Sequence, residues 1–72
     1  MRIKLDPEVH ALYIELHEGE VDRAVELEEG VYADLDADRR VLGVEFVNAN
    51  DFFRVVGNAG HEFVVPEKLV AS

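Results

Sequence analysis

The chain has 72 residues, no cysteine, and sixteen acidic against seven basic residues, which give a formal net charge of −9. A single domain of this length buries a small core, and without cysteine it cannot strengthen that core with a disulfide or a thiolate zinc site, so we expect self-association instead. The negative charge disfavours nucleic-acid binding, and no segment approaches the roughly 20 apolar residues of a membrane span or the layout of a secretory signal, so we expect a cytoplasmic protein.

Alternating apolar and polar residues predict five strands in the first two thirds of the chain. Turn-prone residues Asp6-Pro7-Glu8 separate the first two strands, Gly19 breaks the pattern before the third, and Glu29-Gly30 ends it. The connections between successive strands are short, which favours an antiparallel meander. The predicted strands cover residues 2–6, 12–17, 24–28, 31–35 and 42–46.

Beyond residue 47 the alternation stops and helix and turn signals follow. Asn48 or Asn50 can cap a short helix over residues 51–54, where Asp51 is favourable near the positive end. Further elements are expected as a turn over 57–60, a short strand over 63–65 and a helical turn over 66–69 that begins with proline. The prediction is therefore one domain over 1–72 of α+β, mainly β class, with an antiparallel sheet over 1–47 and a helix, turn and cover segment over 48–72.

One face of this sheet carries more apolar side chains than the rest of the chain can cover. Its expected members are Ile3, Leu5, Leu12, Ile14, Leu16, Val25, Leu27, Val31, Ala33, Leu35, Leu42, Val44 and Phe46. A sheet needs a second layer over such a face, so we expect the C-terminal segment to cover part of it and a second copy, in a twofold homodimer, to cover the rest. Phe52 and Phe53 are adjacent and cannot both face the same surface. The expected interface residues are Phe52, Phe53, Phe63, Val65 and Leu69.

The stretch DLDADRRVLGVE over residues 34–45 has the carboxylate spacing of a calcium loop. Asp34, Asp36, Asp38 and Glu45 fall at loop positions 1, 3, 5 and 12. Position 6, however, is Arg39 where such a loop needs glycine, and both flanks alternate with period two instead of forming helices.

The alternation in this stretch predicts a hairpin. We expect Leu35 to face Leu42, Ala33 to face Val44, and the connection to run from Asp36 to Val41. In that hairpin Asp34 and Glu45 lie on the outer face, near Tyr32 and Gly43. Weak cation binding at Asp36 and Asp38 remains an alternative, and so does a metal-dependent hydrolytic site formed by Asp34, Asp36, Asp38 and Glu45.

No other constellation points to catalysis. His10, His17 and His61 are not at metal-ligand spacing and are expected to be solvated. The only serine is Ser72, at the last position, and the glycines are scattered at turns instead of forming a phosphate loop. We therefore expect no enzyme activity and no cofactor.

Two segments, MRIKLDPEVHALYIEL and EEGVYADLDADRRVLGVEF, contain a fairly specific pattern over about residues 1–50. Its elements are Asp6-Pro7-Glu8, Ala11-Leu12-Tyr13-Ile14, Gly30-Val31, Asp34-Leu35-Asp36, Asp38 and Gly43-Val44-Glu45. The pattern resembles the small prokaryotic family catalogued as domain of unknown function 2283. Arg39 departs from that family's usual turn glycine, and the segment beyond Phe52 lies outside the matched region.

The resemblance implies a compact, mostly antiparallel β domain, with no established activity and no catalytic residues to transfer. Some members are encoded beside small toxin-like partners, which implies an antitoxin-type binding role. Together with the acidic surface, this favours a non-catalytic interaction module that binds a small basic protein. The alternatives are the metal-dependent protein described above and a structural accessory protein.

Overall fold

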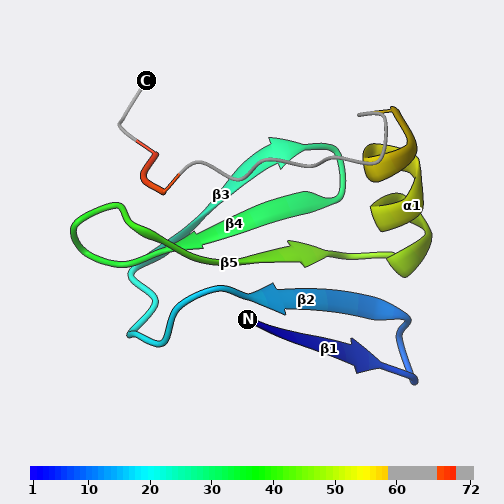
Figure 1. The fold of residues 1–72 in the computed structure, drawn as a ribbon, viewed down its shortest axis with the longest axis horizontal. Helices are drawn as coiled ribbons and strands as arrows, with labels where there is room; N and C mark the ends of the chain where they lie inside the picture. Colours follow the sequence, from blue (N-terminus) through cyan, green and yellow to red (C-terminus); the bar gives the residue numbers. More distant parts are fainter. Residues whose placement is uncertain (59–66, 70–72) are drawn as a thin grey trace.

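The computed structural model describes residues 1–58 and 67–69, which form a five-stranded antiparallel sheet and one helix (Figure 1). The elements are β1 Arg2–Asp6, β2 Ala11–Glu15, β3 Arg23–Glu28, β4 Val31–Leu35, β5 Val41–Phe46 and α1 Ala49–Asn58. The predicted α+β, mainly β class is therefore confirmed.

The order of the strands is β1-β2-β5-β4-β3, so the predicted meander is wrong. β2 pairs with β5, and residues 16–22 carry the chain to the far edge, where β3 pairs with β4. Burial explains this order: β5 is buried at every position except Glu45, whereas β3 is exposed at every position except Val25. An apolar strand is stabilised by a central place, and a strand rich in charged residues is better solvated at an edge.

Backbone hydrogen bonds hold the crossing segment 16–22 against the ends of the central strands. The N–H groups of Leu16 and His17 donate to the carbonyl of Leu42, at 2.8 and 3.0 Å, and Asp22 N–H donates to Leu35 at 2.8 Å. The long connection between β2 and β3 is thus part of the sheet's hydrogen-bonded framework.

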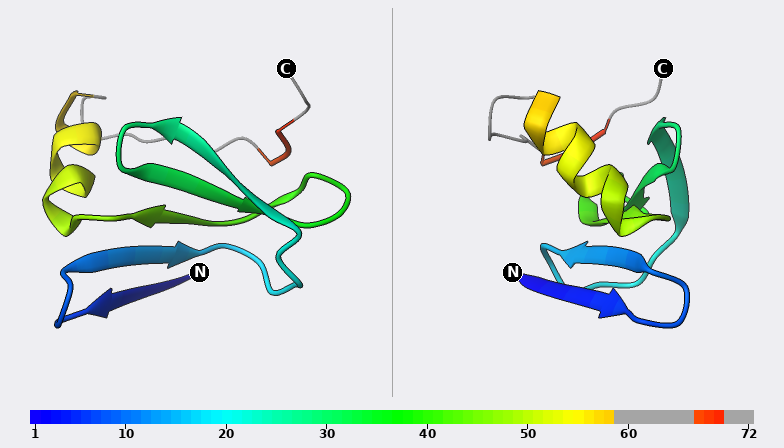
Figure 2. Two further views of the ribbon diagram at one scale, coloured as in Figure 1. Left: turned by 180° about the vertical axis from the view of Figure 1, so that it is seen from behind. Right: turned by 90° about the vertical axis from the view of Figure 1, so that its right-hand side faces the viewer.

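The core lies on one face of the sheet, beneath α1 and beside residues 67–69. Its buried members are Val31, Ala33, Leu35, Val41, Val44, Phe46 and Val55, with Leu12, Ile14, Leu16, Val25, Phe52 and Leu69 packed against them. Figure 2 shows α1 against one side of the sheet, next to the end of β5. The layer formed by α1 and residues 67–69 does not extend over β1. There Ile3 and Leu5 are 58% and 57% exposed, although they share the apolar face.

A β-bulge changes the predicted register of the hairpin between β4 and β5. Ala33 faces Val44 as predicted, but Leu35 faces Val41 instead of Leu42. Leu42 is the extra residue of the bulge; it is buried, and a β-carbon at Gly19 would lie 2.9 Å from its Cδ2. Strict period-two alternation cannot represent a bulge, which inserts one unpaired residue into a strand.

The helix is longer than the sequence predicts. Asn48 caps it, because its Oδ1 accepts a hydrogen bond from Asn50 N–H at 2.9 Å. The helix continues to Asn58, so Gly57 and Asn58 belong to it and not to the predicted turn. Glycine inside a helix costs about 1 kcal/mol, and the packing of Phe52 and Val55 on the core offsets that cost.

Residues 67–69 pair with the tip of the β4–β5 hairpin and do not form the predicted helical turn. Arg40 and Lys68 form an antiparallel bridge, Val41 N–H donates to Glu67 at 2.9 Å, and Leu69 N–H donates to Arg39 at 3.0 Å. This pairing satisfies backbone groups at the start of β5 that the sheet leaves open. The strand predicted over 63–65 lies outside the described residues.

Candidate functional site

The polar face of the sheet gathers residues from all five strands into two rows. One row runs through Lys4, Tyr13, Glu45, Tyr32 and Glu26, and the next through Arg2, Glu15, Gly43, Asp34 and Ala24. Because side chains alternate along each strand, these residues point away from the core. We call Tyr13, Glu15, Glu26, Tyr32, Asp34 and Glu45 the acidic tyrosine face.

Gly43 allows the tyrosine of one strand to reach an acid two strands away. A β-carbon at Gly43 would collide with the hydroxyl and Cζ of Tyr13 and lie 2.9 Å from the carbonyl of Ile14. The hydroxyl of Tyr13 donates a hydrogen bond to Asp34 on β4. Glycine inside a strand marks a close approach of this kind.

Burial and nearby carboxylates raise the pKa values of both tyrosines. Burial, the hydrogen bond to Asp34 and the charges of Asp34, Glu15 and Glu45 raise the pKa of Tyr13 from 10.0 to about 12. The charge of Glu26 first, and then its hydrogen bond, raise the pKa of Tyr32, whose hydroxyl donates to Glu26 Oε2 at 3.3 Å. Both phenols are protonated at neutral pH, as an ordinary tyrosine is, and each donates a hydrogen bond to a carboxylate. The raised pKa values extend the protonated range to higher pH.

The charge on this face is unevenly distributed. At the β1 edge, Glu15 pairs with Arg2 at 3.8 Å and with Lys4 at 3.5 Å. Among residues 1–58 and 67–69, no basic side chain pairs with Glu26, Asp34 or Glu45. The half of the face over β3, β4 and β5 is thus a negatively charged surface beside a basic edge.

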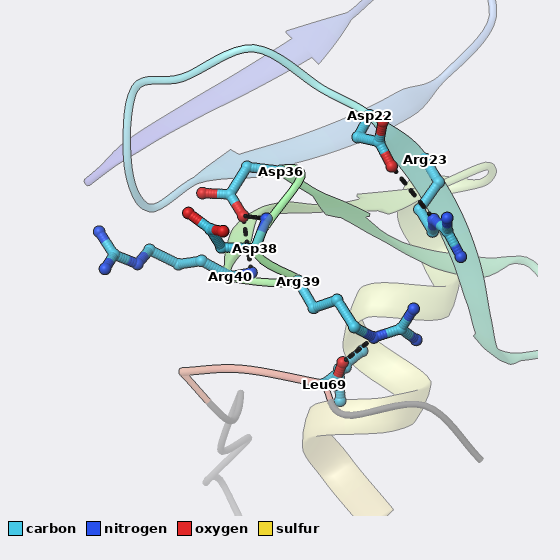
Figure 3. A network of polar contacts seen from close by, with 7 residues as sticks. All are labelled: Asp22, Arg23, Asp36, Asp38, Arg39, Arg40 and Leu69. Atoms are coloured by element: carbon cyan, nitrogen blue, oxygen red, sulfur yellow. Dashed lines mark hydrogen bonds and ion pairs between the residues drawn. The ribbon is translucent and has the colours of Figure 1, made fainter.

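The hairpin tip uses its carboxylates differently. Asp36 Oδ1 accepts hydrogen bonds from the N–H groups of Asp38 and Arg40, both at 2.9 Å (Figure 3). Arg39 occupies the left-handed region at φ 67°, and its Nε donates to the carbonyl of Leu69 at 2.6 Å. The predicted hairpin is confirmed, and Asp36 is its turn-forming residue.

The four carboxylates with calcium-loop spacing are divided between two places. Asp34 and Glu45 lie on the acidic tyrosine face, as the hairpin prediction expected, while Asp36 and Asp38 lie in the tip. Within the described part of the chain, no three His, Cys, Asp or Glu side chains could hold a metal ion together. The geometry therefore gives no support to the hydrolytic alternative that uses all four.

The remaining candidates are dispersed. His10 lies in the β1–β2 turn with φ 58° and His17 follows β2; both are exposed, whereas His61 lies outside the described residues. Among the expected interface residues, Phe52 packs edge-on against Phe46, with ring centroids 5.5 Å apart, and Leu69 contacts the core of its own chain. Phe53 is 71% exposed. Phe63 and Val65 lie outside the described residues.

The sequence predicted only part of the acidic tyrosine face. Alternation placed Tyr13 and Glu15 on one strand face and Asp34 and Glu45 on another. These two sets of residues lie on one continuous surface because β5 is between β2 and β4, an arrangement that a meander excludes. Glu26 joins the face through the same strand order.

No helix in the part of the chain that the structure describes is long and apolar enough to cross a membrane. Neither a curated protein nor a solved structure matches this chain. Residues 2–50, which include all five strands, match the family described as a protein of unknown function, DUF2283. The chain therefore belongs to the DUF2283 family, as its resemblance predicted.

Proposed function

We propose that this chain is a non-catalytic interaction module that binds a small basic protein through the acidic tyrosine face. The observation that carries the proposal is the row Tyr13–Glu45–Tyr32–Glu26, in which tyrosines and carboxylates alternate across neighbouring strands on the side of the sheet opposite α1. A partner that neutralises this row would release the electrostatic cost of holding like charges together.

The chemistry of the face suits lysine and arginine side chains. Carboxylates of Glu26, Asp34 and Glu45 accept charge-assisted hydrogen bonds, and the rings of Tyr13 and Tyr32 present surfaces on which a cation can rest. Strands hold the backbone of these residues in fixed register, so binding does not have to order the backbone of the face. The face has the features of a docking surface, and an antitoxin-type role toward a basic partner is the form of this function that the family resemblance implies.

The test uses a lysine- and arginine-rich peptide of about 20 residues as the probe, followed by NMR of the labelled chain. We expect the largest amide shifts at Tyr13, Tyr32 and Glu45, and an affinity that falls steeply as salt is raised. Glu45→Lys should weaken binding on the order of tenfold, because it reverses a charge at the centre of the row.

The matched control is Glu20→Lys, which makes the same charge change in the exposed stretch 17–22, beside the hairpin-tip residues Asp36 and Asp38 and outside the two rows of the face. We expect it to alter affinity by less than about threefold. Equal losses of affinity in the two variants, or amide shifts spread evenly over all acidic residues, would show that the peptide responds to net charge alone. Either result would overturn the proposal.

A further inference from the structure

The outer edge of β1 is a row of backbone groups with no partner among the described residues. β1 is the terminal strand of the sheet and pairs only with β2 (Figure 1). An open edge of this kind is a template for another strand. We infer that it pairs with β1 of a second copy, antiparallel about a twofold axis, with Lys4 facing Lys4.

Hydrogen-bond directions identify which groups of β1 are free. The carbonyl of Asp6 accepts from His10 N–H inside the hairpin turn, and Leu16 N–H at the end of β2 points to β5. Directions alternate along antiparallel strands. Both observations therefore give the same result. The backbone N–H and C=O groups of Arg2, Lys4 and Asp6 point toward β2, and those of Ile3 and Leu5 point outward.

Only a few registers satisfy this pattern. Outward-pointing groups must face outward-pointing groups, so Ile3 of one copy can face Ile3 or Leu5 of the second, or Leu5 can face Leu5. With Ile3 facing Ile3, Arg2 opposes Lys4 and the charges repel. With Leu5 facing Leu5, Lys4 opposes Asp6, but Ile3 would face Pro7, which lies beyond the end of β1 and has no N–H to donate, so the outward groups of Ile3 stay unpaired.

The third register is complementary at every position except the axis. Ile3 faces Leu5 and exchanges hydrogen bonds with it, and Arg2 faces Asp6, twice by symmetry. Lys4 faces Lys4 at the axis, where each already lies 3.5 Å from its own Glu15. Opposite charges across strands stabilise a pair and like charges destabilise it, so the sequence RIKLD favours its own antiparallel copy in this register.

The pairing also covers the apolar residues that the fold leaves open. Ile3 and Leu5, more than half exposed in one copy, would meet their counterparts on the same face of a continuous sheet. The other edge strand, β3, is a poorer candidate. Its register is broken by a bulge between Glu26 and Glu28, and Glu28 is paired with Arg54 of α1 at 3.3 Å. Bulges and charges protect edges from pairing.

A twofold axis perpendicular to the sheet places both acidic tyrosine faces on the same side of the dimer. Binding of the basic partner does not require this pairing, so the two proposals can fail separately. The pairing is of the isologous kind, which closes after two copies and does not propagate.

The experiment is sedimentation equilibrium of the full chain over a range of concentrations. We expect a dimer, and a rise of about tenfold or more in its dissociation constant for Arg2→Glu, which places like charges opposite each other. Asp6→Arg should act in the same way, and the double variant Arg2→Glu, Asp6→Arg should restore dimerisation because the pair is re-formed with its signs exchanged. The matched control Arg23→Glu reverses the first residue of the other edge strand and should leave the dimer unchanged.

A second variant tests the backbone groups directly. Ile3→Pro removes an outward N–H without removing a hydrogen bond to β2, so we expect a folded monomer. If Ile3→Pro fails to fold, the charge exchange still decides the matter. A wild-type chain that stays monomeric up to millimolar concentration, or a dimer that neither Arg2→Glu nor the double variant affects, would overturn the inference.

Discussion

The phenol of Tyr13 on β2 crosses Gly43 on β5 to reach the carboxylate of Asp34 on β4. This contact joins three strands on the polar face. It explains why a glycine stands in the most buried strand of the sheet, where it would otherwise weaken the strand.

Gly43→Ala should destabilise the fold by about 1–3 kcal/mol, because its β-carbon would occupy the position of the Tyr13 hydroxyl and approach the carbonyl of Ile14. Urea unfolding followed by circular dichroism measures the loss. Part of the loss should disappear in the Tyr13→Ala background, where the ring is absent. Strictly additive effects of the two substitutions would show that the ring and Gly43 do not interact.

The strands themselves were predictable from alternation, whereas their order was not. Residues such as Ile14 and Val44 show which face of a strand is buried but not which strand lies beside it. Composition held a further signal: the sequence RAVELE of β3 has few apolar residues, as expected of an edge strand, and VLGVEF of β5 has many.

Two local features had no signal in the alternation. Arg39 adopts a left-handed conformation that usually belongs to glycine. Two hydrogen bonds hold it there: its N–H donates to the carbonyl of Asp36 at 3.0 Å, and its Nε donates to the carbonyl of Leu69 at 2.6 Å. The bulge at Leu42 lies close to this tip, and it shifts the register that regular pairing would give.

Raising the pH should destabilise the fold through Tyr13. Its pKa is about 12 in the folded chain against 10.0 for an ordinary tyrosine. The unfolded state therefore loses this proton first, and the contribution to stability is complete below pH 10 and disappears as pH rises toward 12. Unfolding free energies measured between pH 9 and about 12 should fall over this interval, and more steeply than in Tyr13→Phe.

The same shift can be read spectroscopically. Tyr32→Phe leaves Tyr13 as the only tyrosine of the chain, so phenolate absorbance reports this residue alone. Asp34→Asn in that background should lower the pKa of Tyr13, because it removes a neighbouring negative charge. A phenol that ionises near pH 10 while the sheet remains folded contradicts the expected environment.

Asp36→Ala should destabilise the hairpin tip by about 1–3 kcal/mol, because two backbone N–H groups lose a charged acceptor. Asp36→Asn keeps the Oδ1 acceptor and should cost less. Asp38→Ala is the matched control: its carboxylate accepts no hydrogen bond within residues 1–58 and 67–69, so its effect should stay within about 0.5 kcal/mol. Thermal unfolding of the three variants decides the order, and equal losses for Asp36→Ala and Asp38→Ala would contradict the assignment of the turn to Asp36.

His10→Gly should stabilise the fold. His10 adopts φ 58° in the β1–β2 turn, a conformation that costs a residue with a β-carbon about 1–2 kcal/mol. Glycine avoids this cost but loses about 0.5–1 kcal/mol through the greater freedom of the unfolded chain, so the net gain should be about 0.5–1 kcal/mol. The hydrogen bonds of residue 10, from its N–H to Asp6 and from Ala49 N–H to its carbonyl, involve the backbone and survive the change.

His17→Gly supplies the comparison. His17 is exposed and is not among the residues with positive φ, so its replacement should bring no gain in stability. If chemical denaturation finds His10→Gly less stable than the wild type, the imidazole itself holds the turn.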